Sequence, residues 1–247
     1  MISPKGSKEN FHIRDSFKKM TFQQKIDYII TYYKFPIITA IIAATVLIST
    51  AVDRATRKQP VLYTAFANVG IGETLLDHLT DEYLLFARKT SKQGVSVYLD
   101  LYISDDASSE NHQYAYASKL KVLGAVSSRQ LDVVFMNREA YDLFSSSGFL
   151  CNFDDLYKED SQLYSQISDL IVNNTVILED NAIEYDLGEA EEYTAKTIEV
   201  RNGLDVSTAP CFASAGFPDT VYLGVIENST HKDEARSFTG YLFEPYP

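Results

Sequence analysis

The chain has 247 residues, with 34 Asp and Glu against 22 Lys and Arg, and its formal net charge at pH 7 is −12. A chain this acidic is a poor partner for nucleic acid or for anionic lipid headgroups, because their phosphates repel it. Its length suits one compact domain, or one domain with a small second lobe, after a short N-terminal region.

Residues 1–34 are predicted to form a basic cytoplasmic segment that ends in a juxtamembrane helix. Thr21 and Gln24 have the spacing of a capping box, so the helix should begin there. Two alternatives stay open, since this helix could lie on the membrane surface or simply lengthen the helix that follows. Proline kinks a helix interior, so we expect a bend at Pro36.

Phe35 to Val52 is an apolar run of 18 residues without a charge. At about 1.5 Å per residue it reaches roughly 27 Å, which is close to the hydrocarbon thickness of a bilayer. A buried helix of a soluble domain and a cleavable signal peptide are the alternatives. Charged flanks, aromatic residues at its entry and the lack of a small-x-small cleavage site favour an uncleaved transmembrane helix over residues 35–52, in contact with the lipid bilayer.

The orientation follows from the Lys and Arg residues on the two sides of this run. Seven lie in residues 1–34 and three in the outer flank. The excess predicts a cell-membrane protein with a cytoplasmic N-terminus and an extracytoplasmic C-terminal domain. Because residues 1–34 carry +4 of the total of −12, the remainder carries −16.

A charged connector at 53–60 leads to a domain at 61–247 that we expect to alternate strands and helices. Strands are predicted at 61–68, 95–103, 131–136 and 221–226. The run at 95–103 alternates as an edge strand does, which places Leu99 inside and Asp100 outside. This pattern predicts an α/β fold with parallel strands and crossover helices.

The helices of this domain are predicted from apolar residues at steps of three and four. The first, at 73–89, should bury Leu76, Leu79, Tyr83 and Phe86, and the second should bury Tyr116, Leu120 and Leu123. Others are expected at 138–147, ended by Gly148, at 160–172, and after a cap at Thr230. Short β-like runs between 174 and 200 predict a small, β-containing second lobe within 158–217.

Two passages resemble the bacterial extracellular solute-binding proteins of the type 2 periplasmic-binding fold. They are RQLDVVFMNREAYDLFSSSGFLCNFDDLY at 129–157 and VYLGVIENSTHKDEARSFTGYLF at 221–243. The resemblance implies an α/β binding domain of bacterial origin that takes up a small solute. The chain differs from that family in its transmembrane helix and in the short stretch left for a second lobe, which implies a reduced, membrane-anchored form.

No pattern of catalysis or of cofactor or metal binding stands out. The four histidines are scattered, and no P-loop, H-E-x-x-H or EF-hand pattern occurs. The sequence also has carboxylate clusters, which are best interpreted as solvated loops: Asp105-Asp106, Asp154-Asp155 and Glu189 to Glu192. We therefore expect neither an enzyme nor a cofactor.

The predicted binding residues lie beyond the carboxyl ends of the parallel strands, where ligands bind in open α/β sheets. They are Asn68, Asp105, Asn137 and Arg138. As residues at strand ends, they should serve recognition more than folding.

Cys151 and Cys211 both follow the apolar run, so a disulfide could join them, and two buried thiols are equally compatible with the sequence.

Two functions remain as hypotheses. In the first, the domain captures a small solute or peptide for a membrane permease or sensor. In the second, it is a non-catalytic scaffold that contacts other envelope proteins through a degenerate solute-binding fold.

Overall fold

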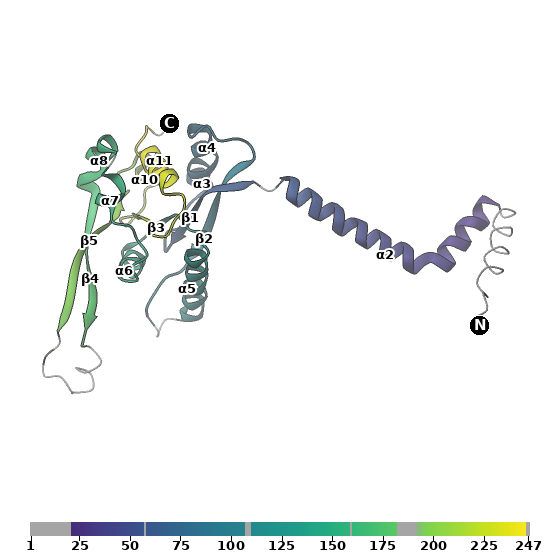
Figure 1. The fold of residues 1–247 in the computed structure, drawn as a ribbon, viewed down its shortest axis with the longest axis horizontal. Helices are drawn as coiled ribbons and strands as arrows, with labels where there is room; N and C mark the ends of the chain where they lie inside the picture. Colours follow the sequence, from purple (N-terminus) through teal and green to yellow (C-terminus); the bar gives the residue numbers. More distant parts are fainter. Residues whose placement is uncertain are drawn as a thin grey trace, which may run out of the picture. The chain divides into compact units, whose positions relative to one another are not determined.

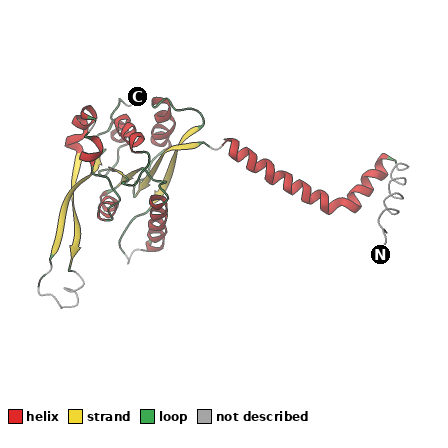
Figure 2. Cartoon of the chain, viewed as in Figure 1, coloured by secondary structure: helices red, strands yellow, loops and turns green. Residues whose placement is uncertain are grey.

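The computed structural model describes residues 21–56, 58–106, 110–158, 160–181, 192 and 194–245. It separates into two compact units, Met1–Arg57 and Lys58–Pro247, which we describe one at a time. The fold is α/β, as the sequence predicts, with one N-terminal apolar helix and a six-stranded mixed sheet (Figures 1 and 2).

The first unit contains the helix α2, Phe22–Thr56, which is 35 residues long and kinked. The kink lies at Tyr33, whose φ of −116° and ψ of 16° are not helical. Pro36 explains it, because its ring clashes with the carbonyl of the residue four positions earlier and it has no N–H to donate. The stretch Tyr33–Val52 is long and apolar enough to cross a membrane by length and composition.

The second unit is built on a sheet with the strand order β2-β1-β3-β6-β5-β4. β1 runs parallel to both β2 and β3, whereas β6 is antiparallel to β3 and β5, and β4 is antiparallel to β5. The strands are β1 Gln59–Ala67, β2 Gln93–Leu101, β3 Val133–Met136, β4 Ile171–Asp180, β5 Ala195–Asp205 and β6 Tyr222–Val225.

Helices cover both faces of this sheet, and the central strand β3 shows why. All four of its side chains are buried, and they alternate between two apolar clusters: Val133 and Phe135 in one, Val134 and Met136 in the other. α5 and α6 pack on the Val134 face, while α3, α7 and α11 pack on the Val133 face. The remaining bounds are α3 Glu73–Asp77, the π-helix η1 His78–Glu82, α4 Tyr83–Phe86, α5 His112–Ser127, α6 Arg138–Ser146, α7 Phe153–Tyr157, α8 Ser161–Ile167, the 3-10 helix η2 Ser168–Leu170, α10 Pro210–Ala215 and α11 Lys232–Leu242.

β2 is an edge strand, as predicted, but the prediction for Leu99 is wrong. Leu99 is 37% exposed, whereas Leu101 is buried at 4%. Asp100 is exposed, as expected, and it has a left-handed backbone with φ of 57°. The pairing of β1 with β2 also shifts register between Ala65 and Ala67. This irregularity ends the alternation before Leu99 can turn inward.

The predicted inner face of α5 is wrong as well. Tyr116, Leu120 and Leu123 are 62%, 51% and 47% exposed. Mostly smaller side chains face the sheet instead. They are Ala115, Ser118, Val122, Ala125 and Val126.

The helix predicted at 73–89 is interrupted by the π-helix η1. Leu79 and Tyr83 are buried as predicted, but Phe86 is 49% exposed and Leu84 is buried in its place. The wider turn rotates the residues after it, so a constant helical period misplaces them.

The helix predicted at 160–172 is shorter than expected, because α8 ends at Ile167 and β4 begins at Ile171. The last helix begins at Lys232 with His231 as its N-cap, so the cap predicted at Thr230 is wrong. Gly148 follows α6 with φ of 69°, as a residue just past a helix end should.

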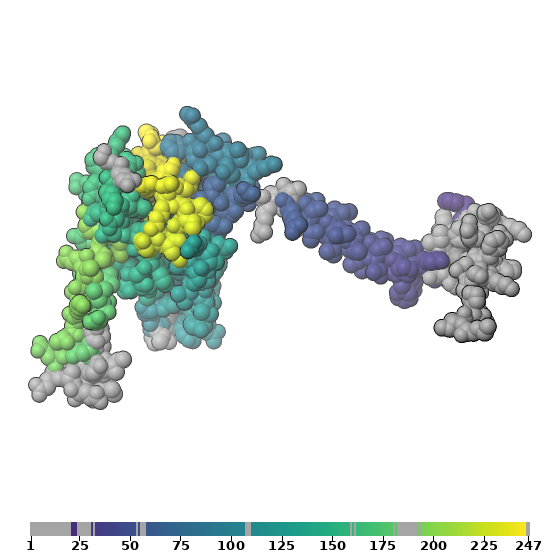
Figure 3. Space-filling view, in the orientation of Figure 1, coloured from purple at the N-terminus to yellow at the C-terminus, as the bar shows by residue number. Residues whose placement is uncertain are grey.

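The segment predicted as a second lobe contributes β4 and β5 to the same sheet as β1 and β3. Their outer halves extend beyond the helices as a two-stranded ribbon, green in Figures 1 and 3. Ile177, Leu178 and Ile198 on this ribbon are 49%, 54% and 45% exposed. The acidic stretch at 182–191 lies outside the described residues.

Candidate binding site

Asn68 and Asn137 meet where the parallel strands β1 and β3 end. The side-chain amide of Asn68 donates to Asn137 Oδ1 at 3.2 Å and to the Ile103 carbonyl at 2.6 Å. Its Oδ1 accepts the Ile103 N–H at 2.8 Å. Asn68 also has a left-handed backbone, with φ of 57°, which asparagine tolerates better than most residues. Asn68 therefore fastens the chain after β2 to the end of β1.

Asn137 is the N-cap of α6. Its Oδ1 accepts the N–H of Ala140 at 3.0 Å, which satisfies one of the free donors at the start of the helix. With Asn68 it joins β1, the segment after β2 and α6. Both asparagines thus make hydrogen bonds that support the fold, and their part in ligand binding stays a prediction.

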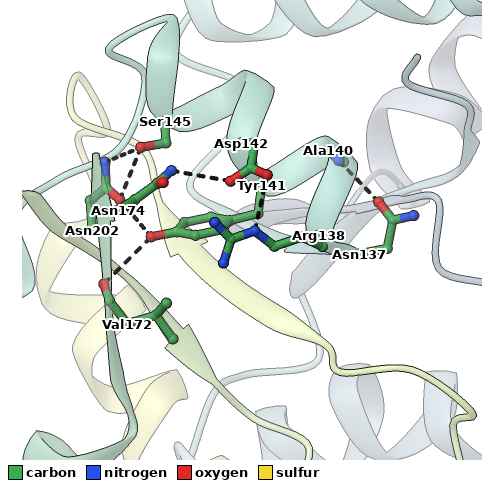
Figure 4. Close-up of polar contacts among 9 residues, drawn as sticks. All are labelled: Asn137, Arg138, Ala140, Tyr141, Asp142, Ser145, Val172, Asn174 and Asn202. Carbon is green, nitrogen blue, oxygen red and sulfur yellow. Dashed lines mark hydrogen bonds and ion pairs between the residues drawn. The ribbon is translucent and has the colours of Figure 1, made fainter. Parts of the chain in front are cut away.

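Arg138, the next residue, is different because it projects from the surface. Its side chain is 54% exposed, and its Nε donates to Asp142 Oδ2 at 2.9 Å. The guanidinium lies 5.6 Å from the ring centre of Tyr141 and 5.9 Å from that of Tyr222. The hydrogen bond to Asp142 is the main cause that raises the pKa of Arg138 above its usual value. Arg138 is thus a permanently charged group held against two aromatic rings, as Figure 4 shows for Tyr141.

A buried polar network supports this arginine from behind. The Tyr141 hydroxyl donates to Asn202 Oδ1 at 2.9 Å, and the Asn202 amide donates to Ser145 Oγ at 2.9 Å. Burial raises the pKa of Tyr141, so its hydroxyl stays protonated and acts as a donor. The ring lies directly against Gly203, where an added Cβ would sit 2.5 Å from it. The Tyr141 ring beneath Arg138 is therefore fixed by packing and by hydrogen bonds.

Asn174 of β4 completes this group of residues. Its amide donates to Asp142 Oδ1 at 3.3 Å, so Asp142 is held from two sides (Figure 4). The sequence offered one signal for this group, because Arg138 and Asp142 have the i, i+4 spacing of a helical ion pair. The contributions of Asn174, Asn202 and Tyr222 depend on tertiary contacts that periodicity does not reveal.

Asp105, the remaining predicted residue, has its contact on another element. It forms an ion pair with Lys119 of α5, and its side chain is 72% exposed. The structure thus brings Asn68, Asn137 and Arg138 together, while Asp105 interacts with α5.

Cys151 and Cys211 are both buried and both free thiols, so the structure has the second of the two arrangements that the sequence allowed. Burial raises the pKa of the Cys151 thiol to about 12 and that of Cys211 to about 11.

The described residues contain no group of three or more His, Cys, Asp and Glu side chains that could hold a metal ion. Asp154, from one of the carboxylate pairs, instead pairs with Arg201 at 2.9 Å and accepts the Tyr164 hydroxyl at 2.7 Å.

Comparison with known proteins finds likeness in structure but none in sequence. No protein-family model matches the chain, and no curated protein matches its sequence. Among solved structures, the chain is similar to the substrate-binding domain assigned to a molybdenum ABC transporter from Clostridium difficile. The TM-score is 0.33 and the identity 10%, and the match covers 75% of this chain and 93% of the other. A likeness at this level carries no argument about what the chain binds.

Proposed function

We propose that the chain is a single-pass membrane protein whose residues 61–247 form a non-catalytic, extracytoplasmic binding domain on a reduced solute-binding fold. Residues 35–52 are its anchor, residues 1–34 lie in the cytoplasm, and 53–60 connect the two parts. Support comes from the apolar stretch in α2 and from the seven Lys and Arg residues that precede it.

Protease added to intact cells, after removal of an outer membrane where there is one, tests this topology. We expect the part after residue 53 to be degraded while an N-terminal tag stays protected. Protection of the C-terminal domain, under conditions that cleave known surface proteins, would contradict the proposal.

The ligand contact that we propose is Arg138. The observation that carries it is a half-exposed guanidinium, at the carboxyl ends of the parallel strands, fixed by Asp142 and two tyrosine rings. A preorganised guanidinium fork suits a planar carboxylate, because both groups can form two parallel hydrogen bonds. The ligand is then a solute or peptide that presents a carboxylate, captured for a membrane permease or sensor.

Thermal unfolding with a panel of dicarboxylates and acidic peptides tests this contact. A ligand at a hundredfold excess over its Kd should stabilise the folded state by about 2.7 kcal/mol. Arg138→Ala should abolish the shift, and Arg138→Lys should weaken it because lysine has no fork. Lys196→Ala, at another exposed cation, is the control. An unchanged shift in Arg138→Ala would refute the assignment.

A scaffold that contacts an envelope protein is the second candidate function. The exposed apolar residues of α5, Tyr116, Leu120 and Leu123, favour it, since apolar patches of this kind mark interaction surfaces. In that case no solute shifts the melting temperature, and crosslinking in the native membrane captures a reproducible partner that Leu120→Glu loses.

A further inference from the structure

A cavity of about 400 Å³ lies between α7 and α11, away from Arg138. It adjoins Glu227, just past β6, and because β6 is antiparallel to β3 this is the amino end of β3. Arg138 follows the opposite, carboxyl end of β3. Figure 3 shows the yellow surface of α11 beside the green surface of α7 and α8. The lining residues are Cys151, Asn152, Asp155, Leu156, Lys158, Glu227, Lys232, Asp233 and Arg236.

Six of the lining residues are charged, and they form three ion pairs. Lys232 pairs with Glu227 at 3.2 Å, Lys158 pairs with Asp155 at 3.8 Å, and Arg236 pairs with Asp233. The cavity therefore has no net charge, so it does not select a simple anion or cation by charge alone.

The positive and negative side chains of the cavity differ in their exposure to solvent. Arg236 is 28% exposed, while its partner Asp233 is 92% exposed. Lys232 is 36% exposed and Glu227 60%. In the pair of Lys158 and Asp155 the cation is again the less exposed partner. Arg236 and Lys232 are thus the less exposed charged groups of the cavity, and the carboxylates of Asp233 and Glu227 lie nearer its rim.

Other contacts hold the inner cations in place. Arg236 also donates to the Leu156 carbonyl at 3.4 Å, which ties α11 to α7. Lys232 is the first residue of α11, so the positive end of the helix dipole adds to its attraction for a carboxylate. Beside it lies the Cys151 thiol, only 2% exposed. The thiol stays neutral because its burial raises its pKa to about 12.

From this arrangement we infer that the cavity binds a small zwitterion that carries a carboxylate and an ammonium group a few bonds apart. Its carboxylate contacts Arg236 and Lys232, and its ammonium contacts the carboxylates of Asp233 and Glu227 at the rim. A zwitterion can replace both halves of an ion pair, so it leaves no charge unpaired. A simple anion or a simple cation pairs with only one of the two signs, so it makes fewer charged contacts in the cavity than a zwitterion does. The volume lies within the range of small-molecule sites.

Isothermal titration calorimetry on the full-length protein in dodecyl maltoside tests the inference. The probes are the common α-amino acids and glycine betaine, with acetate and methylammonium as the single-charge controls. We expect saturable binding of at least one amino acid and at least tenfold weaker binding of both controls. Betaine should also bind weakly, because its quaternary nitrogen donates no hydrogen bond.

Variants then locate the site. Arg236→Met and Lys232→Gln should each weaken binding at least tenfold. The second variant leaves the bond between Arg236 and Leu156 intact, so it separates binding from folding. Arg138→Ala should leave this binding unchanged. This variant therefore tests the inference separately from the ligand contact proposed at Arg138. No binding of any amino acid at 10 mM to folded protein, equal binding of acetate, or unchanged binding in both variants would overturn it.

Discussion

The neighbours Asn137 and Arg138 should respond to alanine in opposite ways. Asn137→Ala removes the cap of α6, which costs about 0.5 to 2 kcal/mol, and a hydrogen bond from Asn68, which costs about 0.5 to 1.5 kcal/mol. The amide of Asn68 keeps its bond to the Ile103 carbonyl, so it is not left without a partner. We expect a total loss of about 1 to 3.5 kcal/mol. Arg138→Ala removes only exposed contacts and should cost about 1 kcal/mol or less.

Thermal unfolding of the full-length protein in dodecyl maltoside, followed by circular dichroism, measures the difference. For a domain of this size the loss in Asn137→Ala corresponds to a fall in Tm of roughly 2 to 14 °C. Asn137→Asp keeps an acceptor at the cap and should recover most of the stability. A Tm of Asn137→Ala within about 1 °C of the wild type would refute the capping role and restore Asn137 as a residue for recognition.

Three further results are expected. Leu101→Ala should cost about 2 to 5 kcal/mol in urea unfolding and Leu99→Ala less than about 1, and equal costs would contradict the irregular end of β2. Cys151 and Cys211 should both be alkylated after unfolding without a reductant, and a mass without added groups would reveal a disulfide. In the folded protein at pH 8 both should react slowly, because pKa values near 12 and 11 leave about one thiolate in ten thousand at Cys151 and about one in a thousand at Cys211. Gly203→Ala should cost about 1 to 3 kcal/mol, because its Cβ would lie 2.5 Å from a tyrosine ring, and wild-type stability would show that the ring can move.

The exposed face of α5 shows how a sequence pattern can mislead. Tyr116, Leu120 and Leu123 have helical spacing, and the same helix also carries small residues at that spacing. Periodicity finds a stripe but does not say which stripe faces a sheet. The face of α5 that carries Ala115, Val122 and Ala125 packs against the sheet, and this choice of face is a tertiary property.

The candidate site shows a second limit of sequence reasoning. The topology brings Asn68, Asn137 and Arg138 together at one end of the sheet, as parallel strands predict. Their roles then differ, because a polar side chain at a strand end can bind a ligand or fasten its own backbone. The fastening role depends on hydrogen-bond partners far along the chain, such as Ile103 for Asn68, which local sequence does not reveal.

The sequence by itself determined the properties that depend on local composition and on residues near one another in the chain. These are the long apolar helix with its bend near Pro36, the α/β class and the edge position of β2. Each follows from a run, a period or a single proline, so nearby residues suffice to predict it.

Tertiary structure alone decided what distant segments do together. It joined β4 and β5 to the main sheet, placed Tyr222 beside Tyr141, and formed the cavity between α7 and α11. The physical reason is that packing and hydrogen bonding depend on distances in space, whereas local patterns record only distances along the chain.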